Sequence, residues 1–277
     1  MTLIVSLINR EYAIQVSDRR FVVHETDGRE TFRDFENKSV IWCNRVAFAY
    51  TGIGNLGVRH ATDQWLAWNI GKWEAERGQG DDQGALVSAI AQKATDYFRG
   101  PRISRLSAEL RRHAFVAIGW AQFPDGDGFE PYIQSIHNFG PGGQTLDHFV
   151  GGGYRLEGRL DQSRTVCHGQ ELSDSERRQM NRQLETLPID PEFAARASSV
   201  LADTVRAVAA RNDRVGRGLL ITVMPRGSIL SGDTGGLQVA GRATPGSADL
   251  PVRAAGPGRD GDLRADGRVR WDGRERL

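Results

Sequence analysis

Thr2 is the residue whose type and position point most directly to chemistry. It follows Met1, and removal of that methionine would leave a threonine with a free α-amine beside its own hydroxyl. Together these groups supply a nucleophile and its general base on one residue. The start of the chain is therefore a candidate catalytic centre, although any threonine exposed by ordinary methionine removal has the same appearance in a sequence.

Other residues with chemical potential form weaker patterns. The six histidines show no i,i+4 pair and no metal-ligand spacing, and the two cysteines, Cys43 and Cys167, are far apart. Gly151-Gly152-Gly153 lacks the Lys-Ser/Thr that follows in a phosphate-binding loop, so a connection between strands fits it better. A nucleophile-elbow motif is also missing. We therefore expect no metal and no cofactor.

The composition narrows the classes of partner. The chain has 277 residues, 39% of them apolar, which is enough for a sizeable core, and a net charge of +1. This charge gives no reason to expect nucleic acid or an anionic membrane as a partner. With no basic leader and no run of eighteen apolar residues, we expect a cytoplasmic protein.

Apolar patterns predict the elements that must position Thr2. Strands are predicted at residues 3–8, 12–17, 39–43, 46–51, 113–122, 131–138 and 219–224. The first four form two hairpins, and residues 24–37 between these hairpins are expected to be a surface loop. Helices are predicted at residues 56–76, 85–98, 104–112, from Ser173 onward and at 191–211, with Asp190 as cap of the last. Ser173 and Glu176 have the spacing of a capping box.

The order of these elements indicates the fold class. Blocks of strands alternate with blocks of helices, which favours an α+β protein with mainly antiparallel sheets. Two sheets flanked by two helical layers would fit this order. We expect one domain over residues 2–240, and a disordered tail over 241–277, where Gly, Pro, Asp and Arg dominate.

The run Thr2-Leu3-Ile4-Val5-Ser6, followed by Asp18, Lys38 and Gly52, resembles the proteasome β-type N-terminal-nucleophile hydrolases, including the bacterial peptidase that works with an unfolding ATPase. The resemblance covers roughly residues 2–232 and is most specific at the N-terminal end. Thr2-Leu3-Ile4-Val5-Ser6 looks like the mature start of that peptidase, and Asp18 follows Thr2 by the family's sixteen residues. Lys38 opens the third strand, and Gly52 ends the fourth, as in the family. A weaker likeness near residues 209–218 puts Asp213 at the family's late aspartate.

The resemblance implies a four-layer αββα sandwich and a role for each of these residues. Thr2 would be the nucleophile, and Lys38 would keep the local field positive while Asp18 holds it in place. Gly52 N–H would bind the oxyanion, and Asp213 would complete the catalytic set. Arg20 would support the loop around Asp18. The substrate cleft would be lined by Phe21, Val22, Tyr50 and Gly54.

Taken singly, the same residues have ordinary explanations. Asp18 fits the end of a strand, Lys38 a solvated charge at a strand edge, and Gly52 and Gly54 turns. Their joint order and spacing favour the catalytic interpretation. Against it, the family's serine after the late aspartate is replaced by Gly216, and its other supporting serine, expected near the three consecutive glycines, is missing.

Three functions therefore remain open. The leading one is a threonine peptidase that acts on peptides or unfolded proteins, assembles into rings or spirals and works with a possible ATPase partner, as the resemblance implies. The second is a non-catalytic, scaffold-type relative, which the missing serines favour. The third is an N-terminal-nucleophile amidohydrolase that acts on a small amide.

Overall fold

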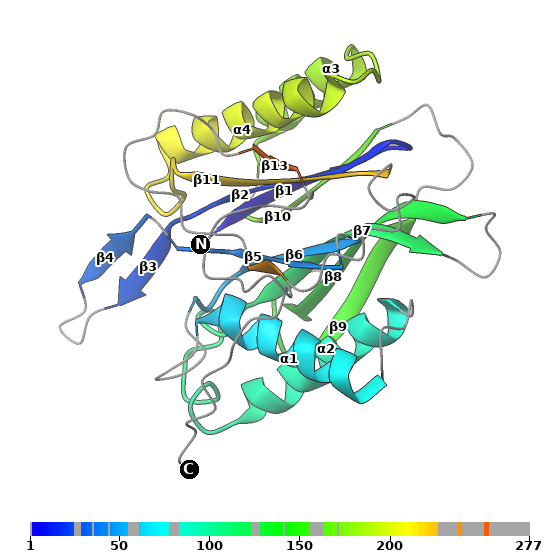
Figure 1. The fold of residues 1–277 in the computed structure, drawn as a ribbon. Helices are drawn as coiled ribbons and strands as arrows, with labels where there is room; N and C mark the ends of the chain where they lie inside the picture. Colours follow the sequence, from blue (N-terminus) through cyan, green and yellow to red (C-terminus); the bar gives the residue numbers. More distant parts are fainter. Residues whose placement is uncertain are drawn as a thin grey trace.

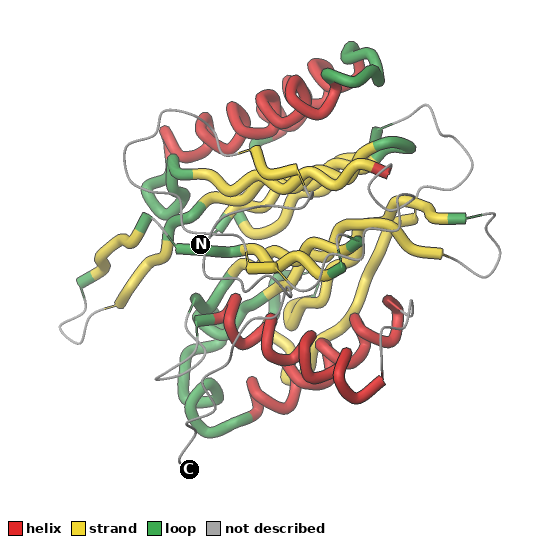
Figure 2. The backbone as a smooth tube through the Cα atoms, viewed as in Figure 1, coloured by secondary structure: helices red, strands yellow, loops and turns green. Residues whose placement is uncertain are grey.

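The computed structural model of this chain describes residues 2–24, 29–34, 36–43, 45–54, 61–77, 83–122, 128–140, 142–155, 163–170, 172–226, 238–239 and 252–254. Helices and strands occur in separate blocks of the chain, and nearly all strand pairs in the two larger sheets are antiparallel. The α+β class predicted from the sequence is thereby confirmed. Figure 2 shows the strands inside and the helices on the two outer sides.

A five-stranded sheet contains the start of the chain. Its strands, in spatial order, are β10 (Arg164–Gly169), β1 (Leu3–Ile8), β2 (Tyr12–Asp18), β11 (Leu219–Pro225) and β13 (Val252–Ala254). The β1–β2 hairpin is closed by Asn9, whose side-chain oxygen accepts from the N–H groups of Glu11 and Tyr12 at 2.9 and 2.8 Å. Such a side chain stabilises a tight turn. Both predicted strands of this hairpin are confirmed.

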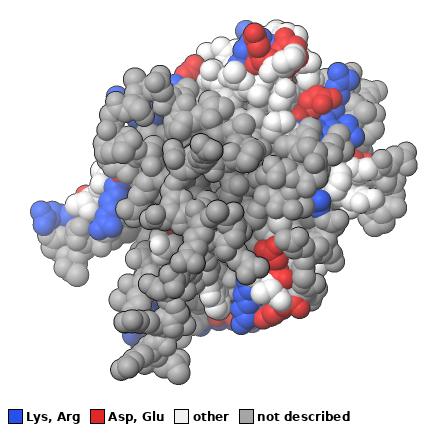
Figure 3. All heavy atoms as spheres, in the orientation of Figure 1, with Lys and Arg blue, Asp and Glu red and all other residues white. Residues whose placement is uncertain are grey.

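The second sheet has six strands, all antiparallel to their neighbours. They are β12 (Gln238–Val239), β5 (Ser39–Trp42), β6 (Val46–Thr51), β7 (Ala114–Gln122), β8 (Phe129–Phe139) and β9 (Thr145–Arg155). A separate hairpin, β3 (Phe21–His24) and β4 (Glu30–Arg33), projects from the body in Figure 1. Figure 3 shows basic side chains on this projection, where Arg33 is exposed.

In the part of the chain that the structure describes, four helices cover the outer faces of the two sheets. Figure 1 shows α3 (Asp174–Glu185) and α4 (Phe193–Arg211) over the five-stranded sheet, and α1 (Thr62–Arg77) and α2 (Gln83–Arg99) over the six-stranded sheet. None of the helices in the described ranges is long and apolar enough to cross a membrane.

Strand β1 is buried on both faces because it lies between a helical layer and the other sheet. Leu3, Val5 and Leu7 pack in a core with α3 and α4. Ile4 and Ile8 point the opposite way and pack in a core between the two sheets. Since successive side chains of a strand alternate in direction, both faces must be mainly apolar, which explains the apolar run at the start of the chain, interrupted only by Ser6.

Two predicted elements differ in the structure. Residues 104–112 form isolated turns, such as the bond from Leu106 N to Ile103 O at 3.0 Å, because so short a segment rarely holds a helix without tertiary support. Within residues 24–37, expected to be a loop, Glu30–Arg33 pair with β3. Strand β10 was not predicted, since it is a short edge strand with only part of its surface buried.

Helix boundaries are confirmed only in part. The capping box is present, because Ser173 Oγ accepts from Glu176 N and the Glu176 side chain accepts from Ser173 N. In contrast, α1 begins at Thr62, and α4 begins at Phe193 with Glu192 as its cap instead of Asp190. The tail beyond residue 240 lies outside the described residues, except for Val252–Ala254, which form β13.

Candidate active site

The hairpin register brings Asp18 beside the first residues of β1. Ile4 pairs with Ser17, so Asp18 lies next to Leu3, whose N–H donates to Asp18 Oδ2 at 2.7 Å. Thr2 is only 3% exposed, and its carbonyl oxygen accepts from Gln170 N at 3.0 Å. The start of the chain is therefore held inside the molecule from both neighbouring strands.

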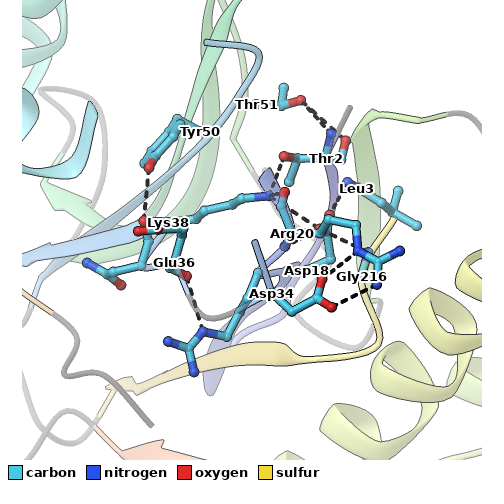
Figure 4. Close-up of polar contacts among 12 residues, drawn as sticks. Thr2, Leu3, Asp18, Arg20, Asp34, Glu36, Lys38, Tyr50, Thr51 and Gly216 are labelled. Carbon is cyan, nitrogen blue, oxygen red and sulfur yellow. Dashed lines mark hydrogen bonds and ion pairs between the residues drawn. The ribbon is translucent and has the colours of Figure 1, made fainter. Parts of the chain in front are cut away.

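Lys38 reaches the same place from the segment that leads into β5. Its ammonium donates to Thr2 Oγ1 at 2.6 Å and to Asp18 Oδ1 at 3.2 Å, and also to the carbonyl oxygen of Arg20. The side chains of Lys38 and Asp18 are both 0% exposed. Figure 4 shows the Lys38 side chain extending toward the Thr2 hydroxyl, with Asp18 beside it. The three predicted residues thus form one buried cluster.

The buried Asp18 carboxylate is compensated by hydrogen-bond donors on several sides. Its donors are Lys38 Nζ and the backbone N–H groups of Leu3, Arg20 and Gly216. A buried charge is tolerated only when it is paired and hydrogen-bonded in this way. These donors satisfy the buried carboxylate, which in turn fixes the position of the ammonium.

Burial changes the acid–base behaviour of Lys38. Removal from water lowers the pKa of its ammonium below the ordinary lysine value, and the neighbouring Asp18 acts in the opposite direction. A lowered pKa makes it easier for the ammonium to lose a proton, and the neutral lysine amine so formed can accept the proton of the hydroxyl that it contacts. The geometry therefore permits general acid–base chemistry at Thr2 Oγ1.

Gly52 lies in a tight turn at the end of β6, packed against His113. Its φ is +108°, and a Cβ there would lie 2.4 Å from the Arg112 carbonyl oxygen, so only glycine fits. Ile53 N donates to His113 Nδ1 at 3.1 Å. His113 is 1% exposed, and burial lowers its pKa to about 3, so the imidazole stays neutral and can accept this bond.

Of the residues expected to line the substrate cleft, Phe21 and Tyr50 lie near Lys38. The Phe21 ring stands 5.0 Å from Lys38 Nζ and 6.1 Å from the Tyr50 ring, and it lies against Gly54. Tyr50 is completely buried, and its hydroxyl donates to the Asn37 carbonyl oxygen at 2.9 Å. Val22 is half-buried in β3, where it pairs with Phe32.

Arg20 ties the loop after β2 to the turn at residues 213–216. Its guanidinium makes a bidentate ion pair with Asp34 and donates to the Asp213 carbonyl oxygen. The Arg20 hydrogen bond lowers the pKa of Asp34. Asp213 itself is exposed, and the contacts of the described residues connect it to the cluster through its backbone.

Gly216 stands where the resemblance led us to expect a serine, and the structure gives a steric reason. A Cβ at Gly216 would lie 2.7 Å from Arg20 Cβ and 3.1 Å from Arg20 N. That close approach allows Gly216 N to donate to Asp18 Oδ1 at 3.2 Å. The position thus contributes a backbone donor in place of a hydroxyl.

Near the three consecutive glycines, where the resemblance led us to expect another supporting serine, the chain has none. Gly151, Gly152 and Gly153 are exposed inside β9, whereas Gln170, just after β10, contacts Thr2, as Lys38 and Thr51 also do. The Gln170 side chain accepts from Asn212 Nδ2 at 2.8 Å. Because β10 was not predicted, the sequence offered no signal for Gln170.

Two further residues of the site were not singled out from the sequence. Thr51 Oγ1 lies 3.4 Å from Thr2 N and 3.3 Å from Thr2 O, and His113 holds the turn after Gly52. Thr51 could have been noticed, since it directly precedes Gly52. His113 gave no signal, because its contact depends on the pairing of β6 with β7.

A metal centre is not gathered among the residues that the structure describes. In these ranges no group of three or more His, Cys, Asp or Glu side chains is placed to hold a metal ion.

Comparison with known proteins does not assign a family. No family model matches the chain, and no curated protein matches it. A solved structure, Anbu (ancestral beta-subunit) from Yersinia bercovieri, is similar with a TM-score of 0.48 and 10% sequence identity, over 80% of this chain and 81% of that chain. At this level of similarity the function has to be argued from the site alone.

Proposed function

We propose that this chain is an N-terminal threonine hydrolase of the proteasome β type, which cleaves amide bonds in peptides. Thr2 would be the nucleophile once Met1 is removed. The observation that carries the proposal is the 2.6 Å contact between Lys38 Nζ and Thr2 Oγ1 beside the fully buried Asp18. Burying a lysine next to a threonine hydroxyl is costly, and a surface or structural role does not require it.

The reaction follows from this arrangement. Thr2 Oγ attacks the carbonyl carbon and forms a C–O bond, while its proton passes to the Thr2 amine. The Lys38 ammonium favours the alkoxide by its charge. Gly52 N–H would donate to the developing oxyanion, a contribution usually worth about 100- to 1000-fold in rate. Collapse breaks the C–N bond, the leaving amine takes the proton, and water then hydrolyses the ester on Thr2.

The resemblance supports several finer proposals. We propose an αββα N-terminal-nucleophile domain over residues 2–240, with residues 241–277 as an appended tail. The substrate would be a peptide or an unfolded protein. Copies of the chain would assemble into rings or spirals, with a possible ATPase partner, in the cytoplasm.

A specific observation favours a second function, a non-catalytic scaffold subunit. Asp213 is exposed, and Gly216 supplies no hydroxyl, so two groups that the catalytic reading expected are absent from the cluster. In this reading the pair of Lys38 and Asp18 would be structural. A small-amide hydrolase differs from the leading proposal only in its substrate.

One experiment separates these functions. The intact mass of the purified chain tells whether Met1 is removed, and incubation with an epoxyketone or a β-lactone tells whether Thr2 is acylated or alkylated. We expect a processed chain that gains one inhibitor mass, and no gain in the Thr2→Ala variant. Retained Met1, or an unmodified Thr2 under conditions that label an active relative, would favour the scaffold. Fluorogenic peptides tested against small amides then define the substrate.

A further inference from the structure

The Thr2 backbone nitrogen has a side-chain partner of its own. Thr2 N donates to Thr51 Oγ1 at 3.4 Å, and Thr51 Oγ1 in turn donates to the Thr2 carbonyl oxygen at 3.3 Å. Thr51 is the last residue of β6 and is 5% exposed. Figure 4 shows its hydroxyl directed at the Thr2 backbone, on the opposite side of Thr2 from Asp18.

The direction of these two bonds matters for the amine that Met1 removal would create. A hydroxyl has one proton, and that proton is engaged by the Thr2 carbonyl oxygen. Its lone pairs are then left for the nitrogen, so Thr51 can only accept from it. An acceptor holds the N–H side of the amine and leaves the nitrogen lone pair free to take the proton of Thr2 Oγ.

We propose that Thr51 is the positioning residue of the Thr2 amine, in the role that the absent serines would otherwise have. The inference rests on the proposed function, because it assigns a partner to that function's general base. Gly216 cannot contribute a hydroxyl, and Gln170 contacts Thr2 through its backbone N–H and the Thr2 carbonyl oxygen. Among the contacts of the described residues, Thr51 supplies the hydroxyl that reaches the Thr2 nitrogen.

The charged surroundings determine how the amine should respond. Lys38 and Asp18 are the charged groups in contact with Thr2 and Leu3. The imidazoles of His113 and His168, on the neighbouring strands, are neutral above about pH 4, because burial lowers their pKa to about 3 and about 4. An acceptor on the amine stabilises its protonated form, so loss of the Thr51 hydroxyl should lower the amine's pKa.

The test compares Thr51→Val with Thr51→Ser. Valine keeps the β-branched shape in the strand and removes only the hydroxyl, while serine keeps the hydroxyl. The rate constant for β-lactone modification of Thr2 is measured by intact mass from pH 5 to 9. Thr51→Val should react about 10- to 100-fold more slowly, as expected for loss of a hydrogen bond to a charged group. In the plot of this rate constant against pH, the acid limb of Thr51→Val should move to lower pH. Thr51→Ser should keep the wild-type rate constant and pH dependence.

The outcomes distinguish this inference from the function on which it rests. A wild-type chain that does not react overturns the proposed function and this role together. If the wild type reacts and Thr51→Val matches it in rate and pH profile, Thr51 has no such role, although the function stands. A uniform rate loss with an unmoved acid limb would indicate a structural effect and also overturn the inference. If Thr51→Val unfolds thermally far below the wild type, Thr51→Ala takes its place in the same comparison.

Discussion

Replacement of Lys38 by methionine should uncouple two properties of the site, stability and reactivity. Methionine keeps the length of the side chain and removes the charge, so the Asp18 carboxylate loses its cation in a fully buried position. Breaking a buried ion pair costs about 3–5 kcal/mol. The backbone donors of Leu3, Arg20 and Gly216 remain, so we expect the lower end, about 3 kcal/mol.

The reactivity of Thr2 should fall much further. Loss of the group that contacts Thr2 Oγ1 at 2.6 Å removes the positive field and the acid–base partner of the hydroxyl. Such groups contribute about 100- to 10,000-fold in rate. Modification of Thr2 by a β-lactone, followed by intact mass, should be at least about 1000-fold slower in Lys38→Met than in the wild type.

The double variant Asp18→Asn/Lys38→Met separates the two effects. It removes both charges, so it should recover about 1–2 kcal/mol of unfolding free energy relative to Lys38→Met, measured by urea denaturation, with Asp18→Asn completing the cycle. It should recover no reactivity. Modification of Lys38→Met within tenfold of the wild type would refute the catalytic reasoning. A double variant no more stable than Lys38→Met would refute the ion-pair reasoning.

Three further predictions concern the turn, the buried imidazole and the capping box. Gly52→Ala should lower the free energy of unfolding by about 1–3 kcal/mol and slow Thr2 modification, because φ at Gly52 is +108° and the added Cβ would meet the Arg112 carbonyl oxygen. Gly128→Ala is the control, since Gly128 has a φ of +146° but no atom within 4 Å of the added Cβ. Equal effects of the two substitutions would contradict the steric argument. His113 has its pKa lowered to about 3, so the unfolded chain binds a proton near pH 6.5 that the folded chain binds only near pH 3. Unfolding free energy from urea titrations should therefore fall by about 1.4 kcal/mol per pH unit from this group as the pH drops through that window, and His113→Gln should flatten the slope. Ser173→Ala should cost about 1 kcal/mol in thermal unfolding without changing Thr2 modification, and a change in reactivity would show that α3 affects the site.

Local patterns were sufficient for the parts of this protein that are built from neighbouring residues. The tight turn closed by Asn9 sets the pairing of β1 with β2, and this register places Asp18 beside Leu3. The capping box at Ser173 is likewise set within four residues. Strand β10 escaped prediction because an edge strand needs no continuous apolar face.

Contacts between the two sheets were decided by the tertiary structure. Lys38 and Thr2 are separated by 36 residues and Thr51 and Thr2 by 49, and their contacts exist only because the two sheets stack with the start of β1 facing the ends of β5 and β6. The resemblance to a family led us to expect Lys38 near Thr2, but composition and spacing could not give the distance between Lys38 Nζ and Thr2 Oγ1.

The residues of the site near the end of the described chain, Asp213 and Gly216, also show what the sequence determines and what only the fold decides. The sequence contains Asp213 and Gly216, but only the folded chain shows that Asp213 is exposed and that Gly216 lies too close to Arg20 for a side chain. A short-range hydrogen-bond pattern depends on a few consecutive dihedral angles, so the residues themselves determine it. The separation of two atoms on distant segments depends on how whole layers pack, and that is a property of the complete fold.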